Sequence, residues 1–204
     1  MTSVLLGDLS VSRETMDRLK ALESLLLKWN PAINLVSKAS LSQSWDRHIL
    51  DSAQIFHLAP NVATWADLGS GGGFPGIVVA CLAKELNPNL TVTLVESDQR
   101  KATFLRQAIR ELSLKADVRA ERIESTAPLA AAALSARALA PLTDLLGFAQ
   151  RHLHPDGIAL FLKGSSWKDE VAMAQKQWHF NLDAHPSATD PNGAILAVKA
   201  IEHV

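Results

Sequence analysis

The spacing of apolar residues predicts two helices in the first sixty residues. Residues 11–29 carry one apolar face at helical spacing, formed by Leu19, Leu22, Leu25, Leu26 and Trp29. Ser12 is suited to cap the start of this helix. Ser40 and Gln43 have the spacing of a capping box, so we expect a second helix to start at Ser40 and continue without a breaker towards Pro60.

Beyond Pro60 the pattern changes to short apolar runs that alternate with helical stretches. The apolar runs predict strands at residues 62–68, 90–96, 116–123, 135–142 and 157–163. Helical patterns cover residues 76–86, 100–112, a segment that ends at His152, and 168–178. Pro75 suits a first helical turn, and Asp98 can cap the helix that follows it. The alanine-rich stretch up to residue 134 fits either a helix or a loop.

The last part of the chain, residues 178–201, fits two strands around a turn at residues 190–193. Together these elements predict an α/β fold: a doubly wound, mostly parallel, seven-stranded Rossmann-like sheet with an N-terminal helical extension. We expect residues 1–60 to form that extension, packed on a core of residues 61–204 as one structural unit.

Composition narrows the class of protein. The chain has 204 residues, 48% of them hydrophobic, which is enough for one domain with a large core. Its net charge is −1, so any nucleic-acid surface has to be a local basic patch. The single cysteine, Cys81, excludes a disulfide framework and a multi-cysteine zinc site within the chain, and we expect no bound metal. No stretch resembles a signal peptide or a membrane span, which predicts a soluble cytoplasmic protein.

A glycine-rich segment, DLGSGGGFPG, occupies residues 67–76 at the end of a predicted strand and before a predicted helix. Such a unit presents backbone N–H groups to a ligand at the edge of the sheet. Gly71, Gly73 and Gly76 satisfy the pattern of dinucleotide-binding proteins. Gly69, Gly71 and Gly73 equally satisfy the pattern of S-adenosylmethionine (SAM) methyltransferases. A glycine turn that only packs a helix on a sheet is the structural alternative.

Two observations favour SAM. Asp67 precedes the glycines, where it would repel a pyrophosphate and attract the ammonium group of SAM. The glycine strand also follows about sixty residues of helix, whereas dinucleotide-binding domains often begin with that strand. Glu96, at the end of the next predicted strand, can accept hydrogen bonds from both ribose hydroxyls of either cofactor.

With these motifs in view, the chain resembles the bacterial small-subunit ribosomal RNA methyltransferase G family, also called glucose-inhibited division protein B. The resemblance covers nearly the whole chain and is carried by KWNPAINLVS (28–37), DRHILDS (46–52), DLGSGGGFPG (67–76), LVESDQRKATFLRQ (94–107), Arg137 and FLKG (161–164). It implies methyl transfer from SAM to N7 of one guanine in the 530 loop of 16S rRNA. The expected partner is therefore 16S rRNA or the small ribosomal subunit, with no DNA and no membrane.

The resemblance also implies roles for single residues. Gly69 and Phe74, with Ser70, Gly71 and Gly73 between them, fall in the cofactor loop, while Asp67 and Glu96 follow the wider pattern of SAM enzymes. Ile123 and Glu124 are expected beside the adenine. Arg137 is expected where cofactor and target base meet, as a cofactor-binding and catalytic residue. It could donate to guanine O6, or instead pair with an acid such as Glu124 or Asp144.

The absence of two motifs used by other methyltransferases agrees with methylation at guanine N7. Guanine N7 has a free lone pair, so methylation needs position and electrostatics more than a general base. We find neither the Asn/Asp-Pro-Pro-aromatic motif expected for amino-group methylation of adenine nor a Pro-Cys nucleophile. Cys81 lies in a predicted apolar helix and is expected to be a small core residue.

Several basic residues are candidates for RNA contacts, each with a simpler alternative. The spacing of Arg47 and Asp51 also allows a simple ion pair on the helix surface, and His48 fits a packed histidine as well as a pocket or RNA role. Lys163 fits a phosphate contact or a solvated lysine. A basic stretch could engage RNA phosphates or form an ordinary charged face: Arg100, Lys101, Arg106, Arg110, Arg119 and Arg122.

Three other functions remain open from sequence. One is a SAM methyltransferase for a small molecule, with the N-terminal helices as a lid over an aromatic pocket. Another is a nicotinamide-dependent oxidoreductase, and the third is a non-enzymatic module that binds SAM and recruits partners to the ribosome. No long exposed apolar stripe stands out, so we expect a monomer.

Overall fold

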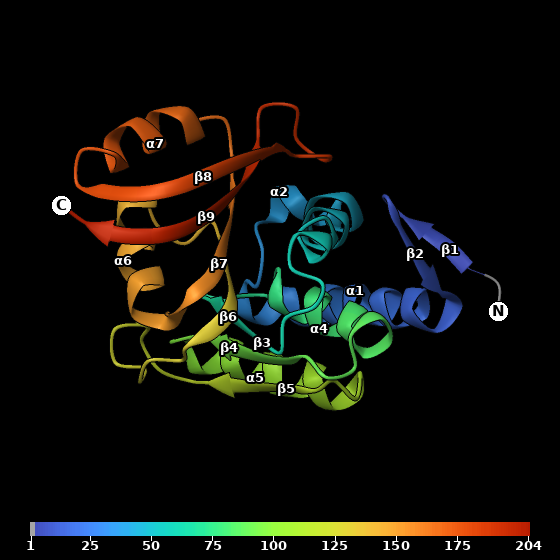
Figure 1. Ribbon diagram of the computed structural model, residues 1–204. Coiled ribbons are helices and arrows are strands. Elements are labelled where there is room, and N and C mark those ends of the chain that lie inside the picture. The colour runs from blue at the N-terminus through green and yellow to red at the C-terminus, as the bar shows by residue number, and fades with distance from the viewer. Residues whose placement is uncertain (1–2) are drawn as a thin grey trace.

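The computed structural model describes residues 3–204 and is built around a seven-stranded sheet with helices on both faces (Figure 1). In spatial order the sheet contains β5 (Ala116–Arg119), β4 (Thr91–Val95), β3 (Thr64–Leu68), β6 (Ala131–Arg137), β7 (Leu153–Lys163), β9 (Ala194–His203) and β8 (Trp178–Pro186). The first five strands are parallel to one another, β9 runs antiparallel to β7, and β8 runs antiparallel to β9. The predicted doubly wound α/β fold is confirmed.

The order of the strands explains where a ligand can bind. From β3 the chain proceeds to β4 and β5 on one side, and then returns to β6 and β7 on the other side. In open α/β sheets such a reversal leaves a crevice at the carboxyl ends of the two central strands. Here those strands are β3, which runs into the glycine loop, and β6, which ends at Arg137.

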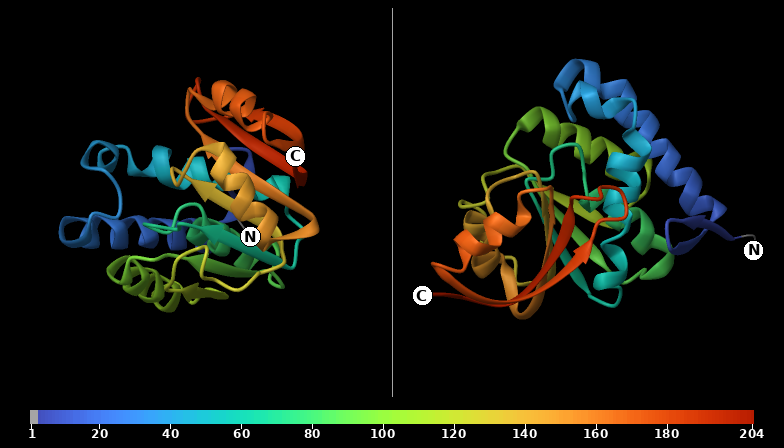
Figure 2. Two further views of the ribbon diagram at one scale, coloured as in Figure 1. Left: turned by 90° about the vertical axis from the view of Figure 1, so that its left-hand side faces the viewer. Right: turned by 90° about the horizontal axis from the view of Figure 1, so that it is seen from above.

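Two layers of helices bury the two faces of the sheet. One face carries α4 (Gly76–Leu86) and α5 (Gln99–Glu111), with α1 (Arg13–Ile33) packed against both; the other carries α6 (Leu142–His152) and α7 (Trp167–Ala174). Alternating residues of β7 serve the two faces: Leu160 and Leu162 pack with the first layer, and Phe161 with the second. The two chain ends lie on opposite sides of the molecule (Figures 1 and 2).

The N-terminal part begins with a short hairpin that the sequence analysis missed. It is formed by β1 (Ser3–Leu6) and β2 (Leu9–Ser12) around Gly7, which has a positive φ of 58°. Strands of four residues carry too little alternation to stand out from the helix that follows. Ser12 caps α1 as predicted, since its hydroxyl accepts a hydrogen bond from the Thr15 N–H.

The predicted uninterrupted helix from Ser40 is wrong. The segment contains instead α2 (Lys38–Leu41), a wider π-type turn η1 (Trp45–Leu50), α3 (Asp51–Ala53) and a 3₁₀ turn η2 (Phe56–Leu58). Ser37 caps α2 by accepting from the Ser40 N–H, whereas the buried Ser40 hydroxyl contacts His48. A tertiary contact therefore uses the side chain that the sequence pattern assigned to a cap.

The limits of β6 also differ from the prediction, because pairing with neighbouring strands overrides the local preference of its residues. The alanine-rich residues 131–134, predicted as helix or loop, begin β6, because Ala131 and Ala133 are buried in a strand that pairs with β7, and Ala133 also pairs with β3. β6 therefore ends at Arg137, and Pro141 precedes α6 rather than interrupting a strand. The limits of α4, the Asp98 cap of α5 and the C-terminal hairpin agree with the prediction.

Two searches of residues 3–204 bear on the class of site. No helix there has the length and apolarity needed to cross a bilayer. Within the same residues, no three His, Cys, Asp or Glu side chains are grouped as metal ligands.

Candidate functional site

A cleft of about 1270 Å³ lies at the carboxyl ends of β3 and β6. The glycine loop and Glu96 form one wall, residues 121–124 extend it, and residues 137–141 cross the floor. The N-terminal segment contributes residues 35–37, Ser40, Arg47, His48 and Asp51, and the turn between β8 and β9 contributes Ser187, Thr189 and Asp190. Ligand pockets are usually about 300–1,000 Å³, so this cleft has room for a cofactor and a second group.

The glycine loop needs its glycines for two different reasons. Gly69, Gly71 and Gly73 have positive φ angles of 63°, 54° and 89°, which side chains rarely tolerate. A Cβ on Gly69 would also lie 2.5 Å from Leu139 across the cleft. Gly73 instead faces Ile77 of α4 and does not line the cleft, so its predicted cofactor contact has no support in the geometry. Gly72, which the sequence analysis did not select, does line it.

Asp67 lies beneath the loop rather than in the cleft. Its side chain is fully buried; Oδ1 accepts from the Ser135 hydroxyl at 2.7 Å and Oδ2 from the Gly76 N–H at 3.2 Å. Burial raises the pKa of this carboxyl to about 6, although hydrogen bonds from Ser135, Ser70 and Gly76 act to lower it. The direct contact with a ligand ammonium group expected from sequence is therefore not supported, because the carboxylate is used to hold α4 and β6.

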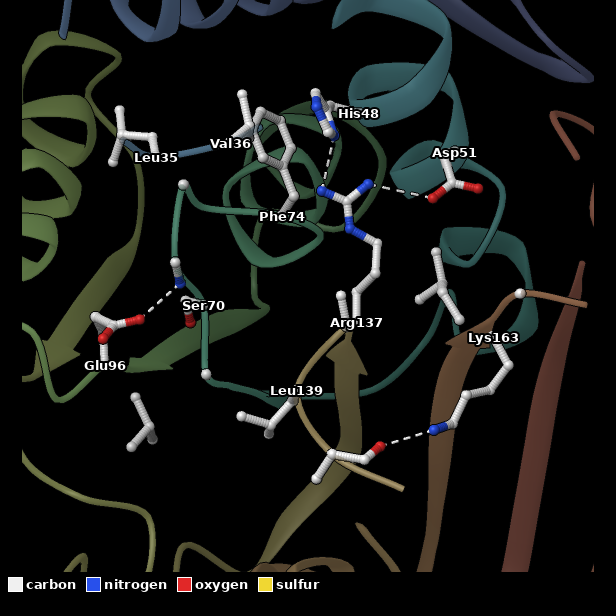
Figure 3. Close-up of a pocket in the computed structure, with 18 of the residues that line it drawn as sticks. Leu35, Val36, His48, Asp51, Ser70, Phe74, Glu96, Arg137, Leu139 and Lys163 are labelled. Carbon is white, nitrogen blue, oxygen red and sulfur yellow. Dashed lines mark hydrogen bonds and ion pairs between the residues drawn. The ribbon is translucent and has the colours of Figure 1, made fainter. Parts of the chain in front are cut away.

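Glu96 stands at the edge of the cleft with its carboxylate held by backbone. Oε2 accepts from the Gly71 N–H at 2.8 Å (Figure 3). Oε1 accepts from the Asp98 N–H at 2.7 Å. Each carboxylate oxygen can accept a second hydrogen bond. Two acceptors at the edge of the cleft beside the glycine loop have room for the adjacent hydroxyls of a ribose, and the predicted ribose contact of Glu96 stays a prediction.

Ile123 and Glu124 line the cleft on the far side of Glu96, after β5. The Ile123 side chain is buried and Glu124 is exposed. Their backbone is fixed from α6, because His152 bonds the Ile123 carbonyl at 3.0 Å and Arg151 donates to the Thr126 carbonyl. No sequence signal marks His152 for this role, since the contact spans 29 residues.

Ser70 supports the loop from within. Its hydroxyl donates to the Asp67 carbonyl at 2.9 Å, and its carbonyl accepts from the Gly73 N–H at 2.7 Å. Ser70 lines the cleft as predicted, but the hydrogen-bonding capacity of its side chain is directed into the loop.

Arg137 crosses from β6 to the N-terminal segment, and only 16% of its side chain is exposed. Nη1 donates to the Arg47 carbonyl at 2.7 Å and to Asp51 Oδ2 at 3.2 Å, and Nη2 donates to His48 Nδ1 at 2.9 Å (Figure 3). The guanidinium also stacks over the Phe74 ring at 5.3 Å. Its acidic partner is therefore Asp51, and neither Glu124 nor Asp144, because β6 points Arg137 at η1 and α3.

The same contacts correct the expected surface pair of Arg47 and Asp51. Asp51 is occupied by Arg137 and, through Oδ1, by Thr189 at 2.8 Å and Gln54 at 2.9 Å. Arg47 contributes its carbonyl to Arg137 while its side chain is exposed at the mouth of the cleft.

His48 is a buried histidine on the wall of the cleft rather than an exposed contact. Its ring stacks on Phe74 at 5.1 Å, and Nε2 lies 3.0 Å from the Ser40 hydroxyl. Burial, together with the charges of Arg137 and Arg47, lowers the pKa of His48 to about 4. The imidazole is therefore neutral at physiological pH.

The other basic residues predicted to contact RNA lie in different surroundings. Lys163 is not a solvated lysine: its ammonium group donates to Glu170 at 2.6 Å and to the Ala140 carbonyl at 2.8 Å, on the opposite side of Arg137 from Glu96 (Figure 3). Arg100 is exposed and pairs with Asp98 at 3.3 Å. Lys101 lines the mouth of the cleft.

Arg122 lines the mouth of the cleft beside Lys101, whereas the other basic residues of the predicted patch lie outside it. Arg106 and Arg110 are exposed on α5, and Arg119 pairs with Asp117 at 3.2 Å. The patch is therefore divided between the cleft mouth and an ordinary charged surface.

Comparison with known proteins shows which family the chain resembles over most of its length. Residues 15–199 match the model of the GidB family, described as rRNA small subunit methyltransferase G. Ribosomal RNA small subunit methyltransferase G of Ruegeria pomeroyi is 54% identical, over 96% of both chains. The protein of the same name from Cereibacter sphaeroides (strain ATCC 17023) is 51% identical over the full length of both.

Solved structures agree on the fold. A TehB-like SAM-dependent methyltransferase from Corynebacterium glutamicum aligns with a TM-score of 0.58 at 18% identity, covering 88% of this chain and 97% of that one. A mutant of MtNAS in complex with SAM aligns with a TM-score of 0.59 at 13% identity, covering 91% of this chain and 75% of that one. At these identities the likeness shows the class I methyltransferase fold alone.

Proposed function

The chain belongs to the rRNA small subunit methyltransferase G family, and from this we propose that it transfers the methyl group of SAM to N7 of a guanine in the 530 loop of 16S rRNA. The observation that carries the proposal is one continuous cleft. It joins a glycine loop and Glu96, which suit the nucleoside of SAM, to Arg137, which suits a guanine.

The residues of the cleft fit the needs of this reaction. When bound, SAM supplies an electrophilic methyl group on a sulfonium sulfur. Guanine N7 carries its own lone pair, so the chain has to align the base and stabilise charge rather than remove a proton. Arg137 uses three of its five N–H groups on Arg47, Asp51 and His48, which leaves Nε–H and one Nη2–H. We propose that one of these donates to guanine O6 and so selects guanine.

The site supports the competing functions less well. A pyrophosphate needs free N–H groups at the start of α4, but buried Asp67 already accepts from Gly76 there and would repel phosphate. A small-molecule methyltransferase needs an enclosed aromatic pocket, yet Phe74 and Phe148 are the only aromatic rings apart from His48 among the described residues that line this wide cleft. A base presented from an RNA loop fits a cleft of this width.

We propose that the RNA approaches over the basic residues at the mouth of the cleft. Arg47, Lys101 and Arg122 line that mouth, and Arg100 is exposed on the same turn as Lys101. Phosphate contacts by these side chains would weaken as salt rises. Lys163 stays a candidate for an RNA contact, because its ammonium group has a third N–H beside those that bind Glu170 and Ala140. It lies on the side of Arg137 away from Glu96, where we propose that the guanine binds (Figure 3). We further propose that the protein acts in the cytoplasm as a monomer.

The test is methyl transfer from labelled SAM to 16S rRNA or small ribosomal subunits from cells that lack this gene. Nuclease digestion and mass spectrometry then identify the labelled nucleoside and its fragment. The proposal predicts 7-methylguanosine from a single loop fragment. Label in another nucleoside, or SAM binding without transfer to any RNA form, would reject it in favour of another target or a recruiting module.

A further inference from the structure

We propose that His48 is a positioning residue for methyl transfer, whose neutral imidazole fixes the guanidinium of Arg137 by accepting a hydrogen bond at Nδ1. The contact itself is read from the structure, and its effect on catalysis rests on the function proposed above. His48 does not need to touch RNA, because only 7% of it is exposed.

The hydrogen bonds around His48 define one tautomer. Arg137 can only donate, so the 2.9 Å contact with Nη2 requires Nδ1 to be the acceptor. Nε2 then carries the proton and donates to the Ser40 hydroxyl at 3.0 Å. The Ser40 hydroxyl in turn donates a hydrogen bond to the Ser37 carbonyl at 2.9 Å. The chain of donors therefore runs in one direction, from Arg137 to the cap of α2.

Phe74 couples this contact to the cofactor loop. The imidazole stacks on the Phe74 ring at 5.1 Å, and the Arg137 guanidinium lies over the same ring at 5.3 Å (Figure 3). Three segments far apart in sequence thus meet around one ring: η1 with His48, the glycine loop with Phe74, and β6 with Arg137. A change at His48 alters the position of the guanidinium relative to the loop that is expected to hold SAM.

Burial and the charges that surround His48 lower its pKa and keep its imidazole neutral, so that Nδ1 can accept. Arg137 faces it from β6 and Arg47 adjoins it on η1, and both disfavour the imidazolium form. Asp51 is the nearest acid in the network, but its carboxylate binds Arg137 rather than His48. Ser40 and Phe74 complete the surroundings without charge. A protonated His48 would present a donor and a positive charge to Arg137, so the contact holds only while the imidazole is neutral.

Two substitutions separate packing from hydrogen bonding. His48→Phe keeps a ring against Phe74 and removes the acceptor, whereas the amide oxygen of His48→Asn can replace Nδ1. We expect His48→Phe to lower kcat about 10- to 100-fold, the range of a misplaced catalytic group, while KM for SAM changes less than about threefold. His48→Asn should recover most of that loss. Equal losses in the two variants, or an unchanged kcat in His48→Phe, would overturn the proposal.

A double-mutant cycle distinguishes positioning from an independent RNA contact. If His48 acts through Arg137, His48→Phe should cost no more than about twofold in kcat when introduced into Arg137→Ala. If the two losses multiply, His48 acts on its own and the proposal fails. Thermal unfolding of each variant checks that the fold is intact.

Nitrogen NMR of the imidazole tests the contact without any assay of methylation. His48, identified by the signal lost in His48→Asn, should be the Nε2–H tautomer and stay neutral to about pH 5, since its pKa is lowered to about 4. Replacing Arg137 by alanine should move its titration upward. An Nδ1–H tautomer or an unmoved titration would overturn the proposal. This result stands even if the protein methylates no RNA, so failure of the contact and failure of the proposed function can be told apart.

Discussion

Replacement of Ser135 by alanine tests the buried network beneath the glycine loop. The Ser135 hydroxyl accepts from Trp65 Nε1 at 2.9 Å and donates to Asp67 Oδ1 at 2.7 Å. All three side chains are at most 1% exposed, so water cannot replace either partner. Ser135→Ala therefore leaves one buried donor and one buried acceptor unpaired at once.

The loss of stability follows from these two bonds and depends on pH. A neutral buried hydrogen bond contributes about 0.5–1.5 kcal/mol and one to a charged group about 1.5–3 kcal/mol. Burial raises the pKa of Asp67 to about 6, so its carboxyl is ionised at pH 8 and largely neutral at pH 5. We expect a loss of about 2–4.5 kcal/mol at pH 8 and about 1–3 kcal/mol at pH 5.

The direction of this pH dependence follows from the protonation state of Asp67 that the Ser135 hydroxyl stabilises. Because the folded pKa of Asp67 lies above its unfolded value, its contribution to stability is complete at low pH and is lost as pH rises through about 6. The Ser135 hydroxyl opposes that loss by donating to the ionised form, so removing it costs more at high pH.

Urea denaturation at both pH values measures the difference, with Ser125→Ala, at an exposed position, as the matched control. A loss below about 0.5 kcal/mol at pH 8, or equal losses at pH 5 and pH 8, would refute the reasoning.

Three further substitutions probe the cleft itself. Glu96→Ala should weaken binding of S-adenosylhomocysteine about tenfold or more by calorimetry, because both ribose acceptors are removed; unchanged affinity would contradict the assigned ribose site. Gly69→Ala should lower both cofactor affinity and the melting temperature, since φ is 63° and the new Cβ would lie 2.5 Å from Leu139. Gly164→Ala, where the Cβ meets open space, is the control that should leave the melting temperature unchanged. Arg137→Ala should reduce kcat about 100-fold while S-adenosylhomocysteine still binds, with Arg137→Lys intermediate; equal activity in wild type and alanine variant would remove Arg137 from the mechanism.

Local rules predicted the elements whose ends are set by their own residues. Pro75 stands at the N-cap directly before α4, and Asp98 caps α5 by accepting from the Arg100 and Lys101 N–H groups, as their positions in the sequence indicated. The same rules failed at Ser40, because its hydroxyl contacts His48 across eight residues, and at residues 131–134, because pairing with neighbouring strands overrides the helix propensity of alanine.

The composition of the site was predictable, but its connections were not. Motifs placed the glycine loop, Glu96 and Arg137 at one edge of the sheet, and the cleft joins them. The position of Asp67 before the glycines marked it for a role in the site, but its partner Ser135 is 68 residues away and could not be foreseen. Because Asp67 is fully buried, the direct ligand contact expected from sequence has no support. Arg137 meets Asp51 across 86 residues, a pairing that follows from β6 ending opposite α3 and that no local pattern encodes.

The central claim is methylation of guanine N7 in the 530 loop, and N7-methylguanosine can be located directly by borohydride reduction and aniline cleavage of the RNA chain. We would compare 16S rRNA from cells lacking the gene and from the same cells supplied with the wild-type protein or with Arg137→Ala. The account predicts cleavage at one guanine of the 530 loop with the wild-type protein, none in the deletion, and much weaker cleavage with the variant. Cleavage there without the gene, or no cleavage with the wild-type protein, would contradict it.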